Sequence, residues 1–251
     1  MDISVSGKVI LVTGAGRGIG RSLAAGLAAE GARTAVLTRR REEGEQLAEE
    51  IGRLSGAGPV FPVVADVSDE DAVAAAVARI DRQWGRIDAL VHNAGWMPPA
   101  TPVLDTDVTR LRAVLETNLV GSFLVTKHVA PVMIRGGGGR IVYISSMIGV
   151  QANPGLAGYG ASKAGVNILS NVVHRELADQ GVRTAALAPG LTDTPGMRAS
   201  VGDEYIAKVA SAYPGGRIGQ PEDVLALTVF LCSDAAQHIS GTLLPVRPIT
   251  G

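Results

Sequence analysis

Two side chains that can carry acid–base chemistry stand four residues apart in the segment GYGASKAG, residues 158–165. Residues at this spacing share one face of a helix, so Tyr159 and Lys163 can point into the same cleft. A tyrosine with a pKa of about 10 transfers protons poorly at pH 7 unless its phenolate is stabilised by about 4 kcal/mol. An ammonium about 4 Å away supplies about 1 kcal/mol in bulk water and about 4 kcal/mol in a partly buried site. The pair therefore predicts a general acid–base centre in a dry cleft.

A glycine-rich segment, TGAGRGIG at residues 13–20, lies between a predicted strand and a predicted helix. Glycines let the chain turn sharply and let a pyrophosphate approach the backbone, while the helix N-terminus offers free N–H groups. The spacing of Gly14, Gly18 and Gly20 differs from the common G-x-G-x-x-G string, so a plain turn is the alternative. The position at a strand-to-helix junction favours a dinucleotide site.

The end of the second predicted strand bears on the choice of coenzyme. Enzymes that use NAD usually place a carboxylate there, which accepts a hydrogen bond from the ribose 2′-hydroxyl. This chain has Thr38 instead, followed by three arginines, Arg39 to Arg41. An arginine can bind a 2′-phosphate bidentately, whereas a carboxylate repels it. The pattern favours NADP(H) over NAD(H), with Arg17 as a second cation, although the arginines can also pair with glutamates of the next helix.

The elements that must position these residues follow from an alternation of short apolar runs with helical patterns, which is typical of βαβ units on a parallel sheet. Strands are expected at residues 8–14, 33–38, 60–66, 88–93, 140–145, 183–189 and 241–246. Helices are expected at residues 19–30, 42–54, 69–84, 108–114, 118–134, 159–179 and 222–232. Ser68 is a plausible N-cap for the third helix, and Gly31 a C-terminal cap for the first. We predict one α/β domain over residues 1–251, a Rossmann-type doubly wound sheet of about seven parallel strands with helices on both faces.

Composition excludes several classes of protein. The formal net charge is −1, with basic and acidic residues interleaved, so nothing favours binding to nucleic acid or to an anionic membrane surface. No apolar run is long enough to span a bilayer, and residues 1–6 do not resemble a signal peptide. The single cysteine, Cys232, cannot form an internal disulfide and fits a reducing compartment. We expect a cytoplasmic protein without a metal site.

The chain resembles the short-chain dehydrogenase/reductases to about Val246. TGAGRGIG looks like the family's T-G-x-x-x-G-x-G loop, HNAG its N-N-A-G segment, and YGASK its Y-x-x-x-K. The resemblance implies that Tyr159 exchanges the proton with the substrate oxygen, while Lys163 lowers its pKa and binds the nicotinamide ribose. It also implies that Ser146 hydrogen-bonds the substrate oxygen and that Asn118 holds a water in a proton relay. Alternatively, Ser145 or Ser146 satisfies a strand end and Asn118 caps a helix.

The resemblance, the glycine turn and the charge pattern together define a predicted coenzyme site. Asp66 and Val67 resemble the pair beside the adenine, residues 93–95 the wall of the coenzyme cleft, and residues 189–194 the turn that fixes the nicotinamide carboxamide. The full predicted set is Gly14, Arg17, Gly18, Ile19, Gly20, Thr38, Arg39, Asp66, Val67, Asn93, Ala94, Gly95, Tyr159, Lys163, Pro189, Gly190, Thr192 and Thr194.

The predicted substrate wall is mainly apolar and includes a lid at about residues 191–215. Its residues are Trp96, Met147, Ile148, Asn153, Leu156, Met197 and Tyr205. Few fixed charges stand there, which favours an NADPH-dependent reduction of a neutral or apolar ketone to a secondary alcohol. The alternative is a 3-oxoacyl thioester reductase, although the ends of the two long helices offer Arg135 and few other basic residues. An alternative of another class is a dinucleotide-binding sensor without turnover, against which the four catalytic residues argue.

Two departures from the family pattern concern assembly and the core. The family often ends in VDGG after its last strand, where this chain has Arg247 and Pro248, so the C-terminal packing expected of relatives is in doubt. Relatives pair through the helices predicted at residues 118–134 and 159–179, which implies a homotetramer or a homodimer. His92 stands where relatives often have asparagine, and we expect it to satisfy a hydrogen bond in the core.

Overall fold

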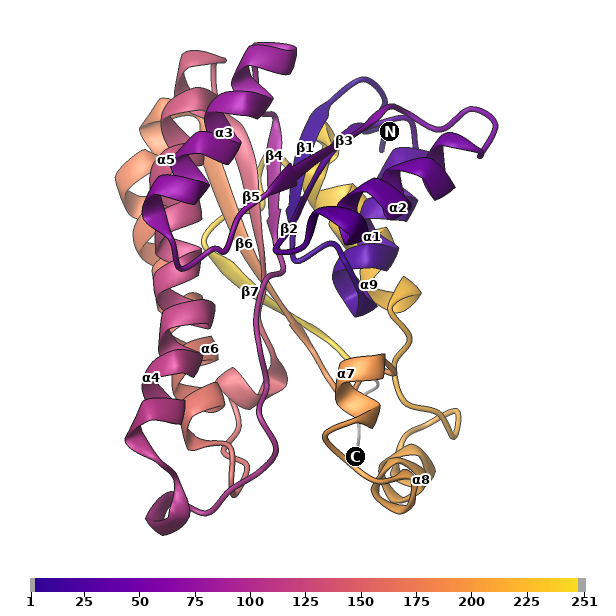
Figure 1. Ribbon diagram of the computed structural model, residues 1–251, viewed down its shortest axis with the longest axis vertical. Coiled ribbons are helices and arrows are strands. Elements are labelled where there is room, and N and C mark those ends of the chain that lie inside the picture. The colour runs from indigo at the N-terminus through magenta and orange to yellow at the C-terminus, as the bar shows by residue number, and fades with distance from the viewer. Residues whose placement is uncertain (1–2, 248–251) are drawn as a thin grey trace.

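Seven parallel strands form one sheet in the computed structural model, which describes residues 3–247 (Figure 1). The strands are β1 (Val9–Thr13), β2 (Arg33–Thr38), β3 (Val60–Val64), β4 (Ala89–His92), β5 (Gly139–Ile144), β6 (Val182–Pro189) and β7 (Thr242–Val246). Their order across the sheet is β3-β2-β1-β4-β5-β6-β7. Each strand lies within the expected segment or within one residue of it, because apolar runs such as that of β1 are buried on both faces. The predicted fold class is confirmed.

Helices cover both faces of this sheet. They are α1 (Gly18–Ala29), α2 (Arg41–Gly52), α3 (Glu70–Trp84), α4 (Val108–Leu115), α5 (Gly121–Arg135), α6 (Ala157–Leu177), α7 (Pro195–Arg198), α8 (Asp203–Ala212) and α9 (Glu222–Cys232). One core cluster joins the sheet to α1, α2 and α9, and a second joins it to α3, α5 and α6. Figure 1 shows these two groups on opposite sides of the strands. Within residues 3–247, no helix has the length and apolar character to cross a membrane.

Two local expectations about helices are wrong. Asp69, rather than Ser68, is the N-cap of α3, because its carboxylate accepts a hydrogen bond from the Ala72 N–H at 3.0 Å. The helices expected at residues 108–114 and 118–134 are one continuous helical run, since a π-helical turn, η2 (Glu116–Val120), joins α4 to α5. Asn118 lies inside that turn, so it does not cap a helix. Such turns are frequent at functional sites.

The α7–α8 segment lies apart from the two helical layers, beyond the carboxyl end of β6 (Figure 1). Thr194 caps α7 by accepting a hydrogen bond from the Met197 N–H at 3.1 Å. Arg198 then binds the carboxylate of Asp193 through two hydrogen bonds of 2.6 Å, which fixes the start of the segment. Residues Pro248–Gly251, on which the expected C-terminal departure partly falls, lie outside the described residues.

The order of the strands places a crevice between β1 and β4. Connections run outward from β1 toward β3 on one side and from β4 toward β7 on the other, so the order in which successive strands are added reverses between β1 and β4. Ligands of doubly wound sheets bind in the crevice outside the carboxyl ends of the strands at such a reversal. Thr13 at the end of β1 and His92 at the end of β4 are neighbours there, paired in register.

Candidate active site

The β1–α1 turn has the backbone of a phosphate-binding loop. Gly14 and Gly18 have φ angles of +64° and +55°, a conformation that other residues rarely adopt. A Cβ atom on Gly20 would lie 2.3 Å from both the Asn93 Nδ2 and the Gly14 carbonyl oxygen, so only glycine fits there. No side chain caps the N-terminus of α1, which leaves its first N–H groups without a side-chain acceptor. A dinucleotide pyrophosphate therefore fits this turn.

Hydrogen bonds tie the turn to the segment after β4. The Asn93 amide donates to the carbonyl oxygens of Thr13 and Gly14, each at 3.2 Å. The Thr13 hydroxyl accepts from the backbone N–H groups of Asn93 and Ala94, at 3.1 and 3.0 Å. With both lone pairs occupied, that hydroxyl donates its proton to His92 Nδ1, 3.1 Å away. The histidine thus satisfies a core hydrogen bond, as expected, and burial lowers its pKa to about 3.

The arginines after β2 divide into paired and unpaired ones. Arg40 pairs with Glu43 and Arg41 with Glu45, as the surface alternative predicts. Within residues 3–247, neither Arg39 nor Arg17 has a carboxylate within ion-pair distance, and both side chains are exposed. The hydroxyl of Thr38 is turned away from solvent and donates to the Arg40 carbonyl at 2.8 Å.

Asp66, after β3, lies close enough to Arg39 to feel its charge. Partial burial of this carboxyl opposes ionisation, but hydrogen bonds from the backbone and hydroxyl of Ser68, together with the charge of Arg39, hold the pKa of Asp66 below its usual range. Val67 is buried beside it, where a Cβ on Gly121 would meet its side chain at 2.7 Å. On the predicted adenine side of the site, the Asp66 carboxylate therefore lies near the unpaired guanidinium of Arg39.

Helix α6 brings Tyr159 and Lys163 together, as their spacing predicts. The Lys163 Nζ lies 5.8 Å from the centroid of the Tyr159 ring and donates a hydrogen bond to the Ile144 carbonyl at 2.8 Å. Across the cleft, a Cβ on Gly95 would lie 3.3 Å from this Nζ and 3.4 Å from the Asn118 Oδ1. The end of β5, the segment after β4 and the π-helical turn therefore converge on the lysine.

The pKa values of this pair differ from the expectation. Burial raises the pKa of Tyr159, and a hydrogen bond with Ser146 only partly opposes that increase. Burial also disfavours the ammonium of Lys163 and lowers its pKa to about 8. The expected lowering of the tyrosine pKa by the lysine is therefore absent in the protein by itself, because desolvation of Tyr159 outweighs its hydrogen bond with Ser146.

The two serines after β5 have separate surroundings. Ser145 is buried, and its hydroxyl donates to the Asn167 Oδ1 at 2.6 Å and to the Lys163 carbonyl at 3.3 Å. Ser146 is half-buried and accepts a hydrogen bond from the Ile148 N–H at 3.2 Å, while its hydroxyl also reaches Tyr159. Ser145 therefore satisfies the strand end, and Ser146 faces the tyrosine.

Asn118 braces the wall of the cleft. Its side-chain oxygen accepts from the Trp96 N–H at 2.7 Å, and its amide donates to the Trp96 carbonyl and to the Ser162 hydroxyl, each at 3.0 Å. Both amide hydrogens are thus used within the protein. The relay water that the resemblance implies would have to bind the remaining lone pairs of this residue.

The turn after β6 closes the far side of the cleft. A Cβ on Gly18 would meet the Thr194 side chain at 3.4 Å, so this turn approaches the glycine loop directly. Thr192 is buried and donates to the Gly190 carbonyl at 3.1 Å. Pro189 is the last residue of β6, and Gly190 accordingly begins the turn. The predicted coenzyme residues that follow β1, β2, β3, β4 and β6 therefore lie at one edge of the parallel sheet.

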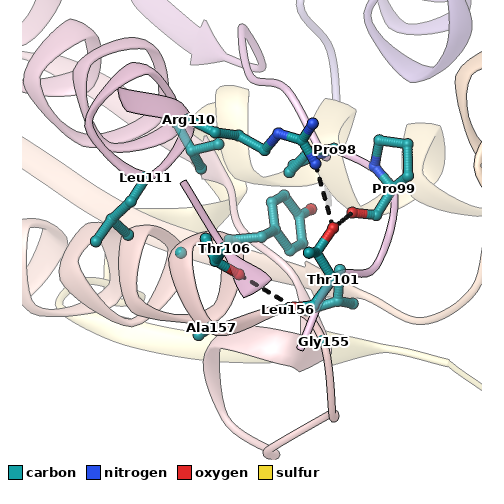
Figure 2. Close-up of a pocket in the computed structure, with 12 residues that line it drawn as sticks. Pro98, Pro99, Thr101, Thr106, Arg110, Leu111, Gly155, Leu156 and Ala157 are labelled. Carbon is teal, nitrogen blue, oxygen red and sulfur yellow. Dashed lines mark hydrogen bonds between the residues drawn. The ribbon is translucent and has the colours of Figure 1, made fainter. Parts of the chain in front are cut away.

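A cavity borders Tyr159 on the side of α4 (Figure 2). It encloses about 290 Å³ of space between atoms, part of which is open to solvent. Its lining residues are Pro98, Pro99, Thr101, Thr106, Arg110, Leu111, Val114, Gly155, Leu156, Ala157, Gly158 and Tyr159. Of the predicted substrate residues, only Leu156 lines this cavity. Trp96, Asn153 and Tyr205 are exposed, Met147 and Met197 are buried, and Ile148 is intermediate.

Sequence reasoning missed the contribution of α4. Arg110, Leu111 and Val114 are spaced so that one helix face carries all three, and this helix follows the segment that begins at the predicted substrate residue Trp96. That spacing was the available signal. No group of three or more His, Cys, Asp or Glu side chains that could hold a metal ion occurs within residues 3–247.

Comparison with known proteins decides the family. A family model described as short chain dehydrogenase matches residues 8–205. The chain belongs to the short-chain dehydrogenase/reductase family. It is 37% identical to a 3-oxoacyl-[acyl-carrier-protein] reductase of Thermotoga maritima, over 96% of this chain and 97% of the relative. It is 39% identical to a cis-4-hydroxycyclohexanecarboxylate dehydrogenase of Sinomonas cyclohexanicum, over 95% and 94%.

Solved structures agree with this assignment. A 7α-hydroxysteroid dehydrogenase in complex with NADH and 7-oxo glycochenodeoxycholic acid superimposes with a TM-score of 0.93 and 31% identity, covering 99% of this chain and 97% of that one. This short-chain dehydrogenase/reductase is therefore an oxidoreductase that acts on CH–OH or C=O groups with a nicotinamide dinucleotide. When bound, that coenzyme supplies or accepts the hydride at the substrate carbon.

Proposed function

We propose that this protein uses NADPH to reduce a ketone to a secondary alcohol, reversibly, on a small molecule with a mainly apolar body. The observation that carries the proposal is that Tyr159, in contact with Ser146 and Lys163, lines a largely apolar cavity. The similarity to a relative named cis-4-hydroxycyclohexanecarboxylate dehydrogenase supports a small cyclic substrate.

The proposed roles of the residues follow from their hydrogen bonds. Because burial raises its pKa, Tyr159 is kept protonated at neutral pH, which suits a proton donor to the carbonyl oxygen during reduction. Ser146 accepts from the Ile148 N–H, and its own proton, which reaches Tyr159 in the protein by itself, would turn to the substrate oxygen. Lys163 donates one hydrogen to the Ile144 carbonyl and keeps two for the nicotinamide ribose and the tyrosine. Asn118 holds the Trp96 backbone that forms the opposite wall.

The preference for NADPH is supported by the two free arginines. Arg39 and Arg17 stand at the ends of β2 and of the glycine loop, and no carboxylate occupies the position of Thr38. Arg39 lies close enough to Asp66 to feel its charge, and this carboxylate would repel a 2′-phosphate. Charge-assisted hydrogen bonds from both arginines to the phosphate would outweigh that repulsion. The same free cations would gain no comparable partner from NADH.

A second candidate is reduction of a 3-oxoacyl thioester. The Thermotoga maritima relative supports it, and the last turn of α6 carries an exposed arginine, Arg175, that the sequence interpretation overlooked. Arg135 contributes less, because its guanidinium is bound to Asp81 at 2.6 Å. The two candidates differ in the substrate beyond the carbonyl, so one substrate panel separates them.

We also propose a homotetramer, or a homodimer, that forms through α5 and α6 and works in the cytoplasm as a single domain over residues 1–251. Exposed apolar side chains on both helices support the assembly. The buried, unpaired Cys232 supports a reducing compartment. Residues 191–215 would form the substrate lid, since α7 and α8 stand outside the helical layers.

The decisive experiment measures coenzyme oxidation by purified protein with NADPH or NADH, against substituted cyclohexanones, open-chain ketones and acetoacetyl-coenzyme A. We expect turnover of cyclic ketones with NADPH, and loss of turnover by at least a thousandfold in Tyr159→Phe with NADPH affinity kept within about threefold. Arg39→Asp should reverse the coenzyme preference. Equal activity of the phenylalanine variant would refute the mechanism, and thioester turnover alone would select the second candidate. Coenzyme binding with no turnover on any substrate would favour the sensor.

A further inference from the structure

One cation shares the cavity with Tyr159, although few fixed charges were expected at the substrate wall. Arg110, on α4, lines the same space as the tyrosine (Figure 2). Its Nη1 donates a hydrogen bond to the Thr101 hydroxyl at 3.2 Å. That hydroxyl in turn donates to the Pro99 carbonyl at 3.2 Å, so the threonine presents a lone pair to the arginine. The guanidinium is therefore held at the cavity by the loop that forms its rim.

This guanidinium has unused hydrogen-bonding capacity. An arginine carries five N–H donors, and the contact with Thr101 uses one of them. Within residues 3–247, no carboxylate lies within ion-pair distance of Arg110. Other arginines, such as Arg40 and Arg198, are paired with acids. A planar cation with free donors at the edge of a cavity suits a carboxylate, which it can bind bidentately.

The rest of the cavity suits an apolar spacer. Pro98, Leu111, Val114 and Leu156 offer hydrocarbon surface in the same cavity as the arginine and the tyrosine. The space of about 290 Å³ includes open solvent, so one side of a bound molecule would stay exposed. The lining therefore matches a compact apolar spacer with a polar group at each end.

We propose that Arg110 determines specificity by binding the carboxylate of a compact oxo acid whose ketone faces Tyr159. The proposal rests on the ketone reduction proposed above and narrows its substrate class from ketones with a mainly apolar body to those that also carry a carboxylate. The ring or short chain between the two groups lies against the apolar wall. Arg110 takes no part in the proton or hydride transfer.

The test compares 4-oxocyclohexanecarboxylate with its methyl ester, which has nearly the same shape and no charge. In the wild type, we expect kcat/KM for the acid to exceed that for the ester by at least tenfold. Arg110→Gln should lower kcat/KM for the acid by at least tenfold, mainly through KM, and leave the ester within about threefold. Arg112→Gln removes the same charge from α4 at an exposed position outside the cavity and should change neither substrate.

Two kinetic results would overturn the proposal. If kcat/KM falls equally for the acid and the ester in Arg110→Gln, the arginine only holds the loop in place through Thr101. If the acid is unaffected, its carboxylate is not bound there. Should neither compound be turned over, the proposed reduction fails, and calorimetric binding of cyclohexanecarboxylate to the NADPH-loaded protein still decides the anchor. Binding that is lost in Arg110→Gln but kept in Arg112→Gln supports it, whereas absent or unchanged binding refutes it.

Discussion

Burial of the Lys163 ammonium in the cleft lowers the stability of the folded protein, and the proposed role of this residue explains why it is present. Lys163 is 5% exposed, and its Nζ has one protein acceptor, the Ile144 carbonyl. Removing an ammonium from water disfavours its charged form, which lowers the pKa from 10.5 to about 8. At about 1.4 kcal/mol per pKa unit, this burial costs the folded protein on the order of 3 kcal/mol at pH 7. A lysine kept at such a cost is more readily explained by function than by packing.

This cost predicts a pH-dependent effect of Lys163→Met on the free energy of unfolding. Between pH 8 and 10.5 the unfolded chain binds more protons at this lysine than the folded one, so its penalty fades as the pH rises. The methionine variant should therefore be more resistant to urea than the wild type at pH 7, with the difference shrinking toward pH 10.5. Lys208→Met, at an exposed position on α8, should show no such trend. A pH-independent difference for Lys163→Met would contradict the burial penalty.

For single residues, the sequence predicts which side chains lie close together, but not how the surrounding fold shifts their pKa values or divides their roles. The four-residue spacing is sufficient to bring Tyr159 and Lys163 together, because helix geometry is local. The sign of the tyrosine pKa shift depends on desolvation by the surrounding fold, which a one-dimensional pattern does not contain. For the same reason, the assignment of adjacent Ser145 and Ser146 to strand end and cleft required the structure.

The glycine turn shows how an element restricts its own sequence. Gly20 lies in the first turn of α1, next to the Asn93 side-chain amide. That amide donates hydrogen bonds to the carbonyl oxygens of Thr13 and Gly14. A methyl group at this position would overlap the Gly14 carbonyl oxygen, which cannot move without breaking its hydrogen bond with Asn93. By contrast, Gly52 ends α2 with no atom within 4 Å of the position of an added Cβ.

The contrast predicts opposite effects for two glycine-to-alanine changes in helices. Gly20→Ala should lower the free energy of unfolding by about 1–3 kcal/mol through overpacking and weaken NADPH binding by at least tenfold. Gly52→Ala should leave coenzyme affinity unchanged and stabilise by up to about 1 kcal/mol, because alanine favours the helix. Thermal unfolding and fluorescence titration with NADPH measure both effects. Equal coenzyme affinity in the two variants would show that the turn does not hold the phosphates.

Elements were predictable where the pattern is periodic and less so where one helix passes into another. Strand positions follow from buried apolar runs, and α9 was expected at its observed bounds. The π-helical turn at Glu116–Val120 has no periodic signature, so one continuous helical run was expected as two helices. The role of α4 in the cavity was missed for a related reason, because a short helix with mostly exposed residues gives a weak pattern.

For the whole molecule, α5 and α6 leave apolar side chains exposed on the outer helical layer. Phe123 on α5 is 51% exposed, and Ile168 and Val172 on α6 are 63% and 42% exposed. Burying a large apolar side chain stabilises by roughly 1.5–3 kcal/mol, so these residues favour contact with another chain. The family resemblance points to pairing through the same two helices, and the exposure of their residues supports that interpretation. A two-fold interface would present each residue twice.

We expect that one charged substitution among the exposed apolar side chains of α5 and α6 dissociates the oligomer. Because a two-fold axis brings the same position from both chains together, Ile168→Asp or Phe123→Asp buries two carboxylates for each interface, which the apolar contact cannot offset. Light scattering after size-exclusion chromatography should show the mass fall from four or two chains to one. Leu104→Asp is the matched control, since Leu104 is 97% exposed but lies outside α5 and α6. An unchanged mass in both interface variants, or a wild type already monomeric, would mean that these helices face solvent and that the cleft of each chain works alone.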